Sequence, residues 1–136
     1  MFAQGTPSAT NYQHLFDLSR GGMGQVALAA RKDGRFVRLY AVKRLLPLLR
    51  EDTDAREMFL EEARLAGLLH HPNVVGVTDV GEDAEGPYLV MDYIEGVSAR
   101  EIILSARAQG IALSISMVCS IVAQVARGLA AAHELR

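Results

Sequence analysis

The chain has 136 residues, half of them hydrophobic, and a formal net charge of −2. This length and composition suit one soluble globular domain, and the charge gives no electrostatic reason to expect nucleic acid or an anionic membrane as a partner. The single cysteine, Cys119, excludes an internal disulfide framework and suits a reducing compartment, so we expect a cytoplasmic location.

The first part of the chain predicts a short leader and then an antiparallel meander. Residues 1–11 have neither the basic nor the apolar region of a signal peptide, and we expect a flexible leader. Three strand-like runs follow, with the sequences HLFDL, QVALAAR and FVRLYAVKRL. Asp33-Gly34 lies between the second and third runs and is a strong hairpin signal.

The next segment, MFLEEARLAGLL, predicts an amphipathic helix over residues 58–69, with Asp54 as its N-cap. On a helical wheel, Glu62 falls near the middle of the arc that holds Met58, Phe59, Leu65, Ala66 and Leu69. An unpaired buried charge is costly. Glu62 therefore either reaches water from a partly exposed helix or has a charged partner, whereas Glu61 points about 100° away and should be solvated.

The remaining pattern predicts two more strands and then helices. The runs VVGVTDVG and PYLVMDYI should be strands joined by the loop EDAEG. After Gly96, the segments VSAREIILSARAQG and SISMVCSIVAQVARGLAAAHEL are helical in character. Five strands with one inserted helix, followed by helices alone, indicate an α+β fold in two parts.

The last helix is unusually apolar. Its uncharged segment, residues 111–126, is short for a membrane span of about 20 residues and contains Ser and Gln, so a buried helix of a soluble protein is the better interpretation. One stripe is formed by Ile115, Val118, Val122, Val125 and Leu129. A helix that is apolar nearly all round belongs inside a larger structure, so we expect an exposed apolar patch and self-association.

A glycine cluster, LSRGGMGQVALA, lies between the first two strand runs and reads S-x-G-x-x-G-x-V from Ser19 to Val26. Successive backbone N–H groups in such a loop can hold phosphate oxygens. An ordinary hairpin loop fits the same residues. His70 and His71 have no third metal ligand at a recognised spacing and should belong to a turn, and His133 should be structural.

Six segments in order resemble the amino-terminal half of a protein kinase, most like bacterial serine/threonine kinases of eukaryotic type. The glycine cluster matches two of the three glycines of the family's loop, and YAVKRL is similar to its V-A-I-K segment. The helix with Glu62, the turn HPNVV, the hinge YLVMDYIEG and the helix end GLAAAHELR complete the series. The resemblance implies an ATP-binding N-lobe, with a five-stranded antiparallel sheet and one helix, over residues 12–94. The hinge exit and first two helices of an incomplete helical C-lobe would occupy residues 95–136.

The resemblance also implies site residues. Lys43 would hold the phosphates of ATP and pair with Glu62. Val26 and Ala41 would cover the adenine ring, Met91 would be the gatekeeper, and the backbone of Asp92 and Ile94 would bond the adenine edge. The full implied nucleotide site comprises Leu18, Ser19, Gly21, Gly22, Gly24, Val26, Ala41, Lys43, Met91, Asp92 and Ile94.

The catalytic motifs of the family do not occur in these residues. H-R-D-L-x-x-x-N and D-F-G supply the base and the Mg²⁺ ligands of a kinase, and neither is present, nor is A-P-E. We therefore expect a fragment that is inactive alone and holds no metal. Its parent would transfer the γ-phosphate of ATP, with Mg²⁺, to serine or threonine of protein substrates. The alternative is a non-catalytic module that binds nucleotide or docks on another kinase.

Overall fold

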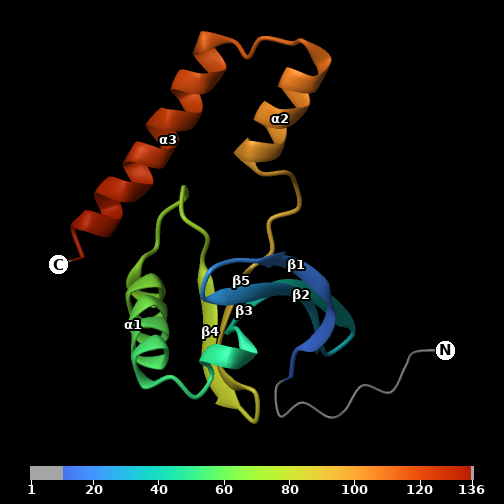
Figure 1. The fold of residues 1–136 in the computed structure, drawn as a ribbon, viewed down its shortest axis with the longest axis vertical. Coiled ribbons are helices and arrows are strands. Elements are labelled where there is room, and N and C mark those ends of the chain that lie inside the picture. Colours follow the sequence, from blue (N-terminus) through green and yellow to red (C-terminus); the bar gives the residue numbers. More distant parts are fainter. Residues whose placement is uncertain (1–10, 136) are drawn as a thin grey trace.

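The computed structural model describes residues 11–135, and residues 1–10 of the expected leader lie outside that range. A five-stranded sheet carries one helix on its face, and two further helices lie beyond one end of it (Figure 1). The elements in chain order are β1 (Gln13–Arg20), β2 (Gly24–Asp33), β3 (Phe36–Leu45), a 3-10 turn (Pro47–Leu49), α1 (Thr53–Leu68), β4 (Val77–Asp83), β5 (Gly86–Asp92), α2 (Ala99–Gln109) and α3 (Ile115–His133).

The sheet has the order β1-β2-β3-β5-β4, and all neighbouring strands are antiparallel. The predicted five-stranded antiparallel sheet with one inserted helix is therefore confirmed. Gly34 has a φ of +62° in the β2–β3 turn, where the hairpin signal predicted it. The helix α1 connects β3 to the edge strand β4, and β5 returns between them.

The predicted loop EDAEG is shorter than expected. Strand β4 continues through Glu82 to Asp83, and Asp83 pairs with Gly86 at the start of β5. Gly86 has a φ of +97°, a left-handed conformation that lets the chain reverse within two residues. Glu82 and Asp83 therefore lie on the strand β4, and Glu85 lies in the turn of the hairpin.

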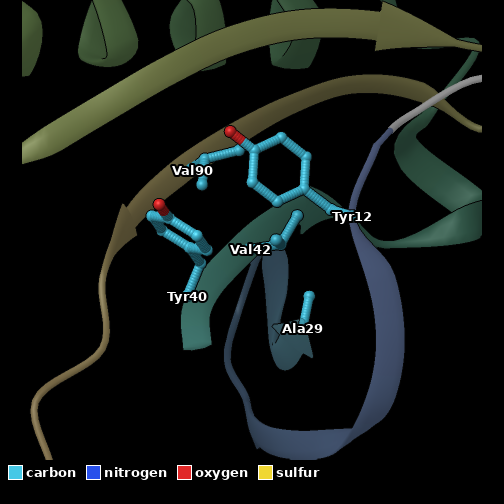
Figure 2. Close-up of a cluster of buried hydrophobic side chains, with 5 residues drawn as sticks. All are labelled: Tyr12, Ala29, Tyr40, Val42 and Val90. Atoms are coloured by element: carbon cyan, nitrogen blue, oxygen red, sulfur yellow. The ribbon is translucent and has the colours of Figure 1, made fainter. Parts of the chain in front are cut away.

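Each face of the sheet has its own buried cluster. Figure 2 shows the first, in which the ring of Tyr12 stands nearly perpendicular to that of Tyr40 with centroids 5.4 Å apart. The second cluster lies between the sheet and α1 and consists of Leu45, Ala55, Phe59, Ala63 and Leu89. The two clusters share the strands β3 and β5, so these central strands are covered on both sides.

The helix α1 differs from its prediction in two ways. Its N-cap is Asp52, whose side chain accepts a hydrogen bond from the Ala55 N–H at 2.8 Å, and the predicted cap Asp54 lies inside the first turn. Its buried residues are Ala55, Phe59 and Ala63, whereas Met58 is 61% exposed. The predicted arc included Phe59 but neither alanine, and Ala55 and Ala63 are buried because their small side chains let the helix lie close to the sheet.

The helices α2 and α3 form a separate part of the molecule (Figure 1). Ser98 and Glu101 make a capping box at the start of α2, and Gly110 ends it in a left-handed conformation. Gly128 is the one residue of α3 that is buried, and it lies close to the Asn73 carbonyl in the turn after α1. The predicted exposed apolar surface is present, since Val122 is 60% exposed. By length and composition alone, α3 could also cross a membrane.

Candidate functional site

Lys43 on β3 and Glu62 on α1 are in contact across the gap between sheet and helix. The Lys43 Nζ lies 2.5 Å from the Glu62 Oε1. The Lys43 side chain is 27% exposed and the Glu62 side chain is 55% exposed. Both answers to the question raised by Glu62 therefore apply, because it has a charged partner and it also reaches water. The wheel placed Glu62 near the middle of the apolar arc, but Phe59 and two alanines occupy the centre of the contact and Glu62 lies at its flank.

Register places apolar residues on the same sheet face as Lys43. Val26 pairs with Lys43, and Ala41 pairs with Met91. Residues that pair across antiparallel strands share a face, and alternate residues of a strand share it too. The sheet face that carries Lys43 therefore also carries the apolar side chains of Val26, Ala41 and Met91. Met91 also packs against the cluster beneath α1.

The glycine loop turns tightly between β1 and β2. The Gly21 N–H donates to the Gly24 carbonyl at 2.8 Å, and the Leu46 N–H donates to the Met23 carbonyl at 3.0 Å. A Cβ at position 24 would lie 2.9 Å from the Arg44 carbonyl oxygen and 3.5 Å from Lys43 Cε. Glycine is therefore needed at position 24 for the loop to lie close to β3, whereas a Cβ at Gly22 would meet nothing within 4 Å.

A cavity of about 210 Å³ lies between the glycine loop, β3 and α1. Lys43 and Glu62 stand at its polar side, and the rest of its lining is Met23, Gly24, Leu45, Met58 and Phe59. The Lys43 ammonium therefore borders a largely apolar space that opens under the loop. Sequence reasoning gave no signal for Met23, and it placed Met58 on the same arc of the helix as Phe59 and Glu62 without assigning it to a site.

The remaining implied residues lie around this face. Ser19 pairs with Val26, and Leu18 occupies an irregular step of the β1–β2 ladder. The Asp92 N–H donates to the Gly76 carbonyl at 3.0 Å, so a ligand edge at Asp92 would have to use its carbonyl oxygen. Ile94 follows β5 and is largely exposed. Leu18 and Ile94 are thus exposed on segments that flank the sheet face of Lys43. Their assignment to this face rests on strand register and on their position in the sequence.

The comparisons with known proteins agree with this geometry. A model of the protein kinase domain matches residues 12–136. The chain belongs to the protein kinase family. The crystal structure of the PknI kinase domain of Mycobacterium tuberculosis superposes with a TM-score of 0.74 at 30% identity, over 98% of this chain and 52% of that domain. The five strands, α1 and the helices that follow therefore correspond to a kinase N-lobe and the start of a C-lobe.

Two curated relatives show how much of a kinase the chain spans. The tyrosine-protein kinase MasK of Myxococcus xanthus is 38% identical over 120 residues, which are 86% of this chain and 18% of MasK. The serine/threonine-protein kinase PknB of Mycolicibacterium smegmatis is 40% identical over 105 residues, which are 69% of this chain and 16% of PknB. The chain thus spans about half of a solved kinase domain and less than a fifth of these relatives.

The kinase match explains the apolar composition of α3 by a place in a folded domain. Only 2% of this chain lies outside the match to the PknI kinase domain, so most of α3 is included in it. A helix at the position of α3 is expected to be apolar if it lies inside a folded lobe. The remaining half of that domain is the part that has no counterpart in these 136 residues.

Other candidate residues do not join the site. His71 Nδ1 accepts a hydrogen bond from the Asn73 N–H at 3.1 Å, so His71 closes the turn after α1, as predicted. His133 lies in the last turn of α3, and Cys119 is exposed on the same helix. Glu61 pairs with Arg64 one turn along α1, and the hydrogen bond from Arg64 lowers the pKa of that carboxyl.

Substituting Gly24 by alanine tests the close approach of the loop to β3. We expect Gly24→Ala to lower the free energy of unfolding by about 1–3 kcal/mol, because the methyl group would overlap a backbone carbonyl that cannot rotate away. Gly22→Ala is the matched control and should change stability little. Thermal unfolding of the two variants measures the difference, and equal melting temperatures would show that the loop does not pack as described.

Neutralising Glu61 and Glu62 in separate variants tests the ion pair between Glu62 and Lys43. Glu62→Gln should lower stability by no more than about 1 kcal/mol, because the pair is exposed. In a complete kinase domain that carries this chain, the same change should strongly reduce activity, since Lys43 loses the charge that orients it. Glu61→Gln should leave activity unchanged. Phosphate transfer and melting temperature are measured side by side, and a larger activity loss from Glu61→Gln would rule out the assigned pair.

Proposed function

We propose that this chain is the ATP-binding part of a serine/threonine protein kinase. The observation that carries the proposal is the Lys43–Glu62 ion pair, which lies under a glycine loop and beside an apolar sheet face. The Lys43 ammonium would contact the α- and β-phosphates of ATP, and Glu62 would fix its direction. The face with Val26 and Ala41 would cover the adenine ring, with the Asp92 carbonyl at its edge.

The activity of the whole protein is proposed from its relatives. PknB is named a serine/threonine kinase, as are several other relatives, whereas MasK is named a tyrosine kinase. We propose transfer of the γ-phosphate of ATP to serine or threonine hydroxyls of protein substrates. The single cysteine and the need for ATP favour a cytoplasmic location for this part of the protein.

Magnesium is proposed for the complete kinase and not for these residues. The family holds Mg²⁺ with the aspartate of D-F-G and the asparagine of the catalytic loop, and both motifs are missing from the 136 residues. Within residues 11–135, the side chains form no group of three histidine, cysteine or acidic residues that could hold a metal ion. These residues therefore do not fit the metal, and we assign the chain nucleotide binding without phosphate transfer.

Binding of a fluorescent ATP analogue to the 136-residue chain tests the proposed site. We expect saturable binding that ATP displaces, because the loop, the lysine and the apolar face are all present. Lys43→Met should reduce the affinity by about tenfold or more, the effect of removing a charge-assisted contact to phosphate. Lys32→Met, on the exposed end of β2, is the control and should bind normally. Equal affinity of the two variants would contradict the site.

We also propose that the isolated chain self-associates through α3, whose apolar side chains are exposed along its length. Sedimentation of the chain should show oligomers. Replacing Val122 and Val125 by lysine should shift them toward monomer, because charge would replace exposed apolar surface without loss of helix propensity. Ser120→Lys adds one positive charge to the same helix without removing apolar surface, and it should leave the oligomers intact. A monomer at all concentrations would contradict the proposal.

A further inference from the structure

A group of arginines and acidic residues joins α1 to the β4–β5 hairpin, on the flank of the helix opposite to the one that carries Glu62. At the base of this group, Arg44 on β3 makes two hydrogen bonds with Asp83, at 2.8 and 2.7 Å. Both side chains are largely buried, and the Arg44 guanidinium lies 4.9 Å from the centre of the Tyr88 ring. The turn of the β4–β5 hairpin is thereby fixed to the same strand that carries Lys43.

The helix α1 is attached to this fixed hairpin by a second ion pair. Arg56, in the first turn of α1, donates to the Glu82 carboxylate at 2.5 Å and to the Arg50 carbonyl at 3.3 Å. Arg50 lies 3.5 Å from Glu85 in the hairpin turn. A Cβ at Gly86 would lie 3.7 Å from the Arg56 guanidinium, so the turn itself comes close to the helix.

Arg56 and Glu62 flank the buried stripe of α1 from opposite sides. At about 100° per residue, each lies roughly 60° from Phe59, in opposite directions. They are separated along the helix axis by about 9 Å. A rotation of α1 about its axis would therefore move one of the two side chains away from the sheet, and the two ion pairs oppose opposite rotations.

The buried contact of α1 leaves this rotation weakly fixed. Its described buried residues are one phenylalanine and two alanines. Alanine has no side chain beyond Cβ to interlock with the residues it faces, so the contact holds the helix close without fixing its angle. Phe59 is the one described buried side chain of α1 that can interlock with the sheet, and the polar contacts on both flanks add to it in setting the angle.

We propose that Arg56 and Glu82 are positioning residues: their ion pair sets the rotation of α1 and so holds Glu62 against Lys43. The inference rests on the proposed function, in which Lys43 holds the phosphates of a nucleotide. Neither residue touches the nucleotide site. Their effect on binding passes through α1 to Glu62 and from Glu62 to Lys43.

The test measures the affinity of the 136-residue chain for a fluorescent ATP analogue. Arg56→Gln and Glu82→Gln should each weaken binding about two- to fivefold, the range that an exposed ion pair supplies. Arg64→Gln is the matched control, because it breaks an ion pair on the same helix that connects α1 only to itself. This control should bind like the unaltered chain.

Two further variants separate positioning from general loss of structure. The exchanged pair Arg56→Glu with Glu82→Arg should restore affinity, since it keeps the ion pair with its charges reversed. In a Glu62→Gln background, Arg56→Gln should weaken binding no further, because the group that Arg56 positions has lost its charge. Melting temperatures of all variants report whether each one folds, and the exchanged pair keeps the test available if Arg56→Gln does not.

The outcomes distinguish the two proposals. If the unaltered chain binds the analogue through Lys43 but Arg56→Gln binds like Arg64→Gln, the positioning role is wrong and the proposed function stands. Additive losses from Arg56→Gln and Glu62→Gln would also overturn the positioning role. If the unaltered chain does not bind the analogue, or if Lys43→Met binds equally well, both proposals fail.

Discussion

The short distance between α1 and the sheet is the constraint on which the candidate site depends. Ala55 and Ala63 let the helix lie against β3 and β5, with Phe59 filling the space between them. Only at this distance can the Glu62 carboxylate reach the Lys43 ammonium. Larger residues at the two alanine positions would separate helix and sheet, so the volume of two methyl groups decides whether the pair can form.

The strands followed from the sequence because local signals agreed with the fold. Asp33-Gly34 marked the first hairpin, and the three runs before α1 all became strands of one sheet. The β4–β5 turn was placed less well, since the acidic residues resembled a loop while Asp83 is held by Arg44 from another strand. That contact joins residues 39 positions apart, and no local pattern carries it.

The contact between Lys43 and Glu62 could be inferred from the sequence, but their environment could not. The family resemblance named the two residues, and the structure brings them together. The wheel placed Glu62 at the centre of a buried arc because it counted Met58 and Leu65 as core residues. Both are exposed, and the helix is rotated so that the alanine stripe faces the sheet. Periodicity identified an amphipathic helix correctly, while the residues that are buried are Phe59 from the predicted arc and two alanines that were not counted in it.

The exposure of the ion pair has a consequence for how a kinase domain could use it. A pair in contact with water is weak, because water competes for both charges and salt screens them. Coulomb attraction grows as the surroundings become less polar, so covering Lys43 and Glu62 would strengthen the same contact without changing its geometry. In the PknI kinase domain, the matched residues are 52% of the structure, and further protein is present beyond them. The attraction between Lys43 and Glu62 would therefore strengthen when nucleotide or protein covers the pair. In the positioning role proposed for Arg56 and Glu82, the hairpin on the other flank of α1 would hold the helix in place during such a response.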